Sequence, residues 1–214
     1  MEPMRKAIEK AGYSVRNIDY RSRSATVEQL SEVVIGNALA DCRHHGAARI
    51  HFVGHSLGGM LVRSYFTRHS ARDLGRVVML GPPNQGSELI DRLGSWRLFS
   101  LINGPCGREL GTSAGSLPNR LGIPDYCVGI IAGNRSVNWI NSWLIPGADD
   151  GKVSVERTRL SGMADHIVIP ATHPFMMRNR EVIRQTIEFL RWGRFDRALT
   201  QDVFFLKSIF QNPK

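Results

Sequence analysis

The sequence has few cysteines, and none of them stands in a pair that could bind a metal. Its 214 residues contain three, Cys42, Cys106 and Cys127, which are widely spaced and form no CxxC motif. An odd number of cysteines at this spacing indicates neither a disulfide framework nor a zinc site. We therefore expect reduced thiols and no metal.

Long apolar runs are also missing. No stretch approaches the roughly 20 apolar residues that cross a bilayer. The first residues, "MEPMRKAIEKAGYSV", mix charges of both signs and lack the apolar core of a secretory signal. We expect no transmembrane segment and a cytoplasmic location, with a targeting segment upstream of Met1 as the open alternative.

Acidic residues are outnumbered, yet the sequence has no recognisable nucleic-acid-binding motif. It contains 28 Lys and Arg against 19 Asp and Glu, which gives a formal net charge of +9. Such a charge favours anionic partners in general. The arginines are spread along the whole chain, so we expect a basic surface and no nucleic-acid partner.

What the sequence does contain is an alternation of strand-like and helical segments. Apolar runs typical of strands lie at 13–20, 49–53, 76–80, 127–134 and 166–170. Amphipathic patterns typical of helices lie at 3–12, 24–46, 57–69 and 179–193. This alternation predicts an α/β fold with a mainly parallel sheet flanked by helices. A chain of this length is most simply one domain, 1–214, with the Gly- and Pro-punctuated region from about 86 to 125 as a small cap or lid.

One short motif stands between a predicted strand and a predicted helix. In "ARIHFVGHSLGGMLVRSYF", residues 47–65, the letters GHSLG at 54–58 match GxSxG. Between a strand and a helix, that motif makes a nucleophile elbow, and its two glycines remove Cβ atoms that would collide in a strained turn. The turn makes Ser56 the candidate nucleophile, and the N–H of Leu57 at the start of the helix is the expected oxyanion donor.

A serine hydroxyl needs a general base, and the sequence offers seven histidines. Two of them, His166 and His173, follow the serine in the order nucleophile, acid, base that this type of elbow requires. His173 stands in "PATHPFMMRN", a loop after a predicted strand, where catalytic side chains gather. His166 begins a predicted strand. We expect His173 to be the base, with His166 as the alternative.

The orienting acid should follow a strand that precedes the histidine. Asp149 and Asp150 in "IPGADDGKVSV" meet that requirement, although a solvated Asp-Gly turn is the alternative interpretation. An ionised carboxylate at this place would hold the imidazole in the tautomer that accepts the serine proton. We favour Asp150 and keep Asp149 as the second choice.

Together these motifs resemble the lipase- and esterase-like branch of the α/β-hydrolase superfamily over most of the sequence. "GHSLGGMLVRSY" is similar to the elbow and helix of bacterial lipases, and "GPPNQGSEL" to their TPHxGS segment. "DDGKVSVERTRL" resembles their acid loop, NDGxVxxxS, and "THPFMMRNREVIRQTIEFL" their histidine loop and closing helix. The resemblance implies a triad of Ser56, Asp150 and His173 that hydrolyses an acyl ester or lipid through an acyl-enzyme, without a cofactor.

One part of the family pattern is missing. Relatives usually begin with a strand ending in His-Gly, and the loop after it supplies a second oxyanion N–H, whereas this sequence starts within the next helix. Either the fold is N-terminally truncated, as a fragment or from an alternative start, or the protein completes the oxyanion hole in another way. The loss of one donor implies reduced activity. The resemblance also implies exposed sheet edges, which favour a homo-oligomer.

The cap region is expected to form the substrate wall. Its candidates for an apolar acyl pocket are Trp96 and Phe99, together with Leu98, Leu101 and Ile102, and ordinary core packing is the alternative for each. His55 in the elbow is a further candidate for substrate contact. Two other functions stay open: a non-catalytic hydrolase-like module that recruits an acidic partner, and acyl transfer to an alcohol or lipid by the same triad.

Overall fold

The computed structural model describes residues 1–93, 104–136 and 145–198. At its centre is a sheet in the order β1-β2-β3-β4, in which every neighbouring pair of strands is parallel. The strands are β1 (Ile50–His55), β2 (Leu74–Leu80), β3 (Val128–Gly133) and β4 (Asp165–Ile169). The predicted parallel sheet is confirmed, and four of the five predicted strands are present in it.

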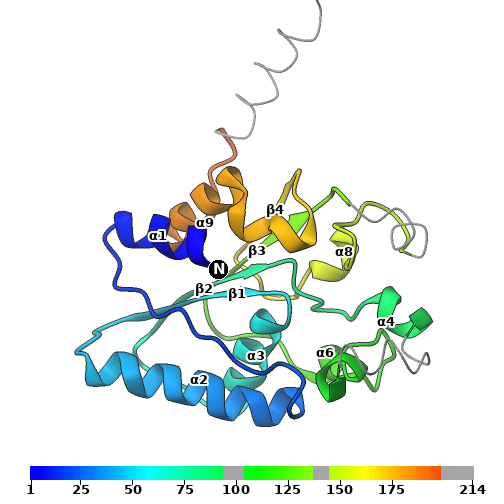
Figure 1. Cartoon of the computed structure of the whole chain (residues 1–214), viewed down its shortest axis with the longest axis horizontal. Coiled ribbons are helices and arrows are strands. Elements are labelled where there is room, and N and C mark those ends of the chain that lie inside the picture. Colours follow the sequence, from blue (N-terminus) through cyan, green and yellow to red (C-terminus); the bar gives the residue numbers. More distant parts are fainter. Residues whose placement is uncertain (94–103, 137–144, 199–214) are drawn as a thin grey trace, which may run out of the picture.

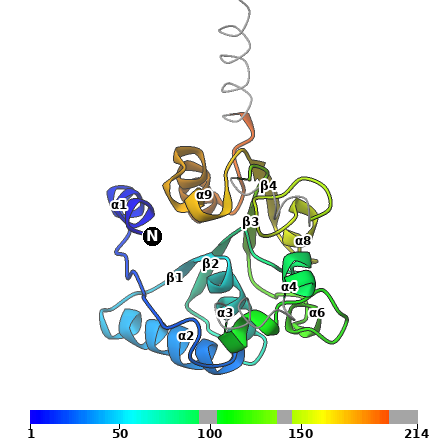
Figure 2. The same ribbon diagram turned by 45° about the vertical axis from the view of Figure 1, so that its right-hand side comes forward.

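Helices cover both faces of this sheet (Figure 1). Those on one face are α1 (Glu2–Lys10) and α9 (Arg180–Trp192), and those on the other are α2 (Val27–His44) and α3 (Leu57–Phe66). Figure 2 shows the same two layers, with α1 and α9 above the sheet and α2 and α3 below it. These helices correspond to the predicted ones, so the α/β architecture is confirmed.

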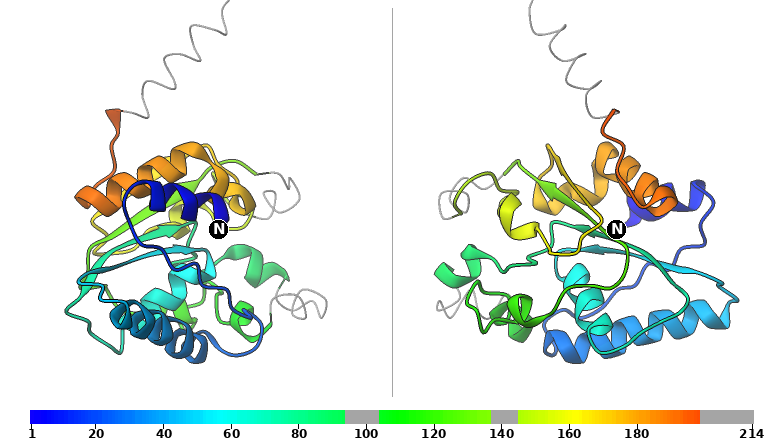
Figure 3. Two further views of the ribbon diagram at one scale, coloured as in Figure 1. Left: turned by 60° about the vertical axis from the view of Figure 1, so that its left-hand side comes forward. Right: turned by 180° about the vertical axis from the view of Figure 1, so that it is seen from behind.

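Shorter helices gather beyond one end of the sheet (Figure 3). They are α4 (Glu88–Leu93), α6 (Leu117–Arg120) and α8 (Val155–Thr158). A 3₁₀ helix, η1 (His173–Arg178), comes directly before α9.

Residues of the central strands alternate between two apolar cores, one under each helix layer. On β2, Val77 and Met79 pack with residues of α2 and α3, whereas Val78 and Leu80 pack with residues of α1, α9 and η1. Successive strand side chains point to opposite faces, so a parallel sheet covered on both faces needs an unbroken apolar run. The sequence VVML meets this need, and all four side chains are completely buried.

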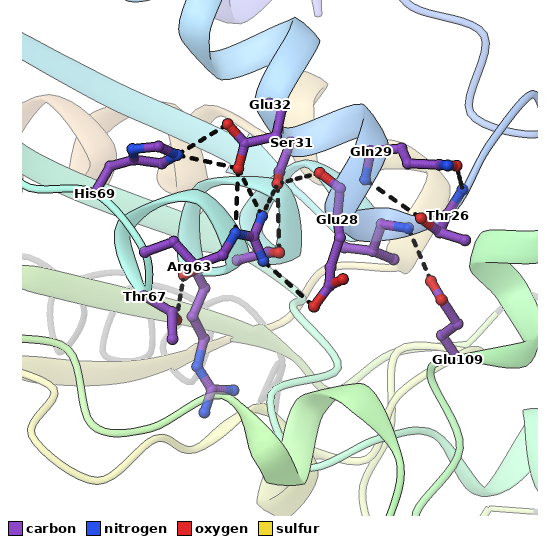
Figure 4. Close-up of polar contacts among 12 residues, drawn as sticks. Thr26, Glu28, Gln29, Ser31, Glu32, Arg63, Thr67, His69 and Glu109 are labelled. Carbon is purple, nitrogen blue, oxygen red and sulfur yellow. Dashed lines mark hydrogen bonds and ion pairs between the residues drawn. The ribbon is translucent and has the colours of Figure 1, made fainter.

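The start of α2 is fixed by a capping box. Thr26 Oγ1 accepts the Gln29 N–H at 3.3 Å, and Gln29 Oε1 accepts the Thr26 N–H at 3.2 Å (Figure 4). Glu109 accepts the Val27 N–H at 2.8 Å. The Glu109 contact anchors the helix to a segment 82 residues further along the chain.

The prediction of a fifth strand at 13–20 is wrong, because this segment runs beside β1 without joining the sheet. Tyr13 meets the His51 ring edge-on, with centroids 5.8 Å apart. Within the described residues, however, no backbone hydrogen bond joins residues 14–20 to β1. A groove of about 590 Å³ lies between the segment and the strand and is lined by residues of both. A strand needs a hydrogen-bonded neighbour, so β1 remains an edge strand.

The region predicted as a cap, 86–125, contains α4 and α6 and is anchored to the loop that carries the two aspartates. Ser87 Oγ donates to the Lys152 carbonyl at 2.7 Å, and Glu88 forms an ion pair with Arg157 at 2.9 Å. The candidate pocket residues lie outside the described residues, and their role stays a prediction. They are Trp96, Leu98, Phe99, Leu101 and Ile102.

Candidate active site

Ser56 lies at the tip of the turn between β1 and α3, in a backbone conformation that residues other than glycine rarely adopt. Its φ is 52° and its ψ is −117°. No other non-glycine residue in the described part of the chain has a positive φ. Serine at a helix N-cap usually caps the helix with its hydroxyl, but Ser56 makes no side-chain capping bond. The hydroxyl is therefore available for chemistry, and the strained backbone fits a nucleophile elbow.

The two glycines of the motif, Gly54 and Gly58, differ in whether the space around them could hold a Cβ. A Cβ on Gly54 would lie 2.5 Å from the Gly59 nitrogen, closer than real Cβ contacts come, so α3 packs directly onto the end of β1. A Cβ on Gly58 would meet the Tyr20 hydroxyl at 3.8 Å, which is ordinary contact. The expectation that both glycines relieve a collision is right for Gly54 and wrong for Gly58.

The first turn of α3 presents an amide next to the serine. Leu57 is the first residue of the helix, and its N–H has no backbone acceptor within the described residues, as is usual at the start of a helix. The Ser56 N–H instead donates to the Leu80 carbonyl at 2.9 Å, which joins the elbow to the end of β2. The Leu57 N–H at the start of α3 is thus without a backbone acceptor in the described part of the chain, and its role as an oxyanion donor stays a prediction.

Asp150 and His173 form a buried pair, with side chains 0% and 3% exposed. The His173 Nδ1–H donates to Asp150 Oδ2 at 2.7 Å, and the His173 N–H donates to the Asp150 carbonyl at 2.9 Å. Asp150 Oδ1 accepts the N–H groups of Lys152 and Val153, each at 3.0 Å. Both carboxylate oxygens therefore have donors, and the hydrogen bond at Nδ1 sets the tautomer of the ring.

Asp149, the second choice for the acid, takes a different place. Its Oδ1 accepts the Gly151 N–H at 2.7 Å, inside its own turn. This contact is the Asp-Gly turn that the sequence offered as the alternative interpretation. The structure brings Asp150, and not Asp149, to the Nδ1 of His173.

His166, the alternative base, lies on β4, where its Nε2 is 3.0 Å from Thr158 Oγ1. Burial lowers the pKa of His166 to about 4. Of the remaining histidines, His69 binds Glu32 of α2 at 2.9 Å (Figure 4). The side chains of His166 and His69 are therefore engaged by Thr158 and Glu32, and neither contacts Asp150.

Gly81 brings the end of β2 against the Asp150–His173 pair. Its φ is +54°, and a Cβ there would lie 2.8 Å from Asp150 Oδ2 and 3.1 Å from His173 Nδ1. Glycine suits both the conformation and the close approach. The similarity of GPPNQG, residues 81–86, to a lipase segment does not by itself predict that Gly81 lies against the acid–base pair. The position of Gly81 directly after the buried run RVVML, at the carboxyl end of a strand, is the signal that could have found it.

The second nitrogen of the His173 ring, Nε2, is buried and has no hydrogen-bond partner within the described residues. His55 contacts this residue: its Nε2–H donates to the His173 carbonyl at 3.0 Å, and the ring centroids are 4.7 Å apart. Because Ser56 follows His55 in the chain, the contact puts the elbow beside the histidine. An unpaired ring nitrogen opposite the acid is what a general base requires.

Metal-ligand clusters and membrane-spanning helices are absent from residues 1–93, 104–136 and 145–198. No three His, Cys, Asp or Glu side chains come together there as a metal site. No helix in those ranges is long and apolar enough to cross a bilayer. The three cysteine thiols are free, and Cys106 is buried.

Several solved structures share this fold. Lipase BlEst2 of Bacillus licheniformis in its mature form matches with a TM-score of 0.72 and 21% identity, over 87% of this chain and 83% of the lipase. Phospholipase PlaB of Legionella pneumophila matches with a TM-score of 0.67 and 19% identity, over 89% of this chain and 56% of the phospholipase. The esterase EaEST of Exiguobacterium antarcticum matches with a TM-score of 0.57 and 12% identity, over 89% of this chain and 86% of the esterase.

The likeness lies in the fold and not in close sequence similarity. No protein-family model matches the chain, and no curated protein sequence matches it. The three structures are nevertheless similar to this chain over most of its length. The chain has the α/β-hydrolase fold of lipases and esterases.

Proposed function

We propose that the chain is a serine hydrolase that cleaves carboxylic esters of small molecules or lipids through an acyl-enzyme on Ser56. The observation that carries the proposal is the buried His173–Asp150 pair, joined at 2.7 Å beside a strained serine whose hydroxyl does not cap its helix. A nucleophile, a base and an orienting acid are the groups that acyl transfer requires. The fold shared with lipases and esterases supports the same reaction class.

The first half of the reaction forms the acyl-enzyme. His173 Nε2 accepts the proton of the Ser56 hydroxyl while Oγ forms a bond to the ester carbonyl carbon. The carbonyl π electrons move onto its oxygen, to which the Leu57 N–H donates. The bond to the leaving alcohol then breaks, and His173 returns its proton to that alcohol. Asp150 keeps the ring oriented and stabilises the imidazolium.

The second half releases the acid and restores the enzyme. A water molecule gives a proton to His173 as its oxygen attacks the acyl carbon. The bond from that carbon to Ser56 Oγ breaks, and Oγ regains the proton from His173. An alcohol in place of water would give a new ester by the same steps, so product analysis in the presence of added alcohol separates hydrolysis from acyl transfer.

The proposal is tested by hydrolysis of p-nitrophenyl acetate, butyrate and octanoate. We expect turnover by the wild type, a loss of at least about 10⁴-fold in Ser56→Ala, and no loss in Ser70→Ala, an exposed serine after α3 that serves as the control. The acyl chain with the highest kcat/KM indicates the length of acyl group that the substrate pocket accommodates best. Equal rates in wild type and folded Ser56→Ala would contradict the proposed hydrolase activity and favour a non-catalytic binding module.

We also propose that the chain associates with a second copy through the open edge of β1. Within the described sheet, β1 pairs with β2 alone, and the groove of about 590 Å³ on its other side is lined in part by the exposed Ile18 and the half-buried Phe52 and Val53. An unpaired strand edge beside apolar side chains favours association. Light scattering should show a dimer or a larger oligomer, and a monomer at all concentrations would contradict this proposal.

A further inference from the structure

His55 is the residue of the elbow that contacts His173, through a hydrogen bond to its carbonyl and through the two rings. It is the last residue of β1, directly before Ser56. Its Nε2–H donates to the His173 carbonyl at 3.0 Å. Its ring lies against the His173 ring, with centroids 4.7 Å apart and planes tilted by 46°.

This contact adds to the hydrogen bonds that hold His173. Asp150 accepts two of them, from the His173 N–H at 2.9 Å and from Nδ1 at 2.7 Å. His55 donates a further one to the carbonyl of the same residue. The base is therefore held by the acid on one side and by the neighbour of the nucleophile on the other.

We infer that His55 is a positioning residue, which holds the backbone at His173 so that Nε2 faces the Ser56 hydroxyl. The inference rests on the proposed function of Ser56 and His173 and adds a residue that acts through the base. It differs from the substrate contact expected from the sequence, because the protein itself engages the donor nitrogen of His55. Since His55 and Ser56 are adjacent, a single bond couples the position of the base to that of the nucleophile.

The charge state of His55 suits this role. Burial, with a smaller contribution from His173, lowers the pKa of His55 to about 4, so the ring is neutral near pH 7. A neutral ring protonated at Nε2 donates the bond to the carbonyl without placing a positive charge beside the base. A cation at this position would oppose the protonation of His173 that the first half of the reaction requires.

Two substitutions separate the hydrogen bond from the ring contact. His55→Phe keeps a ring against His173 and removes the donor. His55→Gln removes the ring and keeps an N–H donor at a similar reach. His51→Phe is the matched control, because His51 is on the same strand and its Nδ1 accepts the Arg76 N–H at 2.9 Å. Circular dichroism establishes that each variant is folded, and His55→Ala replaces His55→Phe if the latter does not fold.

The expected effect is on turnover and not on binding. With p-nitrophenyl butyrate, His55→Phe should lower kcat about 10- to 100-fold and leave KM within about twofold, because a displaced base slows the reaction of bound substrate. His55→Gln should recover most of the lost kcat, and His51→Phe should behave as the wild type. A wild-type kcat in His55→Phe, or a raised KM with unchanged kcat, would overturn the inference.

A spectroscopic measurement tests the same inference without turnover. The His173 Nδ1 proton, hydrogen-bonded to Asp150, should give a strongly downfield proton NMR signal in the wild type and in His55→Gln. The signal should broaden or disappear in His55→Phe, and an unchanged signal would overturn the inference. Ser56→Ala is measured alongside. If that variant keeps its activity, the proposed function fails, and the NMR comparison alone decides whether His55 holds His173.

Discussion

The elbow and the acid–base pair reach their geometry by different routes. Ser56 is held by its neighbours in the sequence, because Gly54 lets α3 pack on the end of β1 and α3 begins at the next residue. Asp150 and His173 are held by each other, and Gly81, from a third part of the chain, lets the end of β2 approach them closely. The nucleophile depends on a local turn, and the other two groups depend on tertiary packing. A Cβ added at Gly54 of the elbow should therefore act on folding, whereas side-chain changes in the acid–base pair should act on turnover.

Among substitutions that leave Ser56 in place, the largest effect is expected for Asp150→Asn, which should break the acid–base pair and leave the elbow intact. Asparagine has nearly the same volume, but it removes the charge and favours the wrong tautomer of His173, so kcat should fall about 10³- to 10⁴-fold. Asp149→Asn is the matched control and should cost less than about tenfold, because Asp149 accepts the Gly151 N–H. Steady-state kinetics on both folded variants decide, and an equal or larger loss in Asp149→Asn would reverse the assignment of the acid.

The next effect is on stability and concerns the elbow. Gly54→Ala forces a Cβ to within 2.5 Å of backbone, so it should lower the free energy of unfolding by about 3 kcal/mol or prevent folding. Gly58→Ala should leave stability unchanged or raise it by up to about 1 kcal/mol, because alanine is the better helix former and has room there. Urea denaturation measures both. Equal destabilisation by the two substitutions would contradict the difference drawn between these glycines.

The smallest effect is on the pH dependence of stability. It involves two buried histidines, His55 in the elbow and His166 on the opposite edge strand, β4. Burial lowers the pKa of His55 and of His166 to about 4 each, whereas unfolded histidine titrates near about 6.5. The unfolded chain therefore binds more protons between these values, and stability falls as pH decreases from about 6.5 to about 4. His166→Gln should reduce this fall in the thermal midpoint while leaving kcat near its wild-type value. An identical fall in variant and wild type would show that His166 does not contribute.

The elements that sequence reasoning predicts well are those whose determinants are local. The buried runs RVVML and CVGIIAGN specify central strands, because both faces of a parallel sheet must be apolar. The Ser56 motif lies within five residues, so its setting between a strand and a helix is sufficient to expect the turn. The pairing of Asp150 with His173 was expected from motif order and resemblance, but the distance between them depends on how separate segments pack.

The features that were not predicted depend on neighbours in space. Residues 13–20 have strand-like composition, yet a groove lies between them and β1, so no ladder forms. The role of Gly81 depends on the two side chains that reach it from later in the sequence. His55 was expected to contact substrate because it lies in the elbow, and only the folded chain shows that its donor faces the His173 carbonyl.

The claim that the two regions form one catalytic unit is tested most directly by labelling with a fluorophosphonate, which reacts with an activated serine. We predict one label per chain, located on Ser56 by peptide mass spectrometry. Labelling should be at least about 10²-fold slower in Asp150→Asn than in wild type, and unchanged in Asp149→Asn. Labelling of a different residue, or equal rates in Asp150→Asn and wild type, would contradict the account.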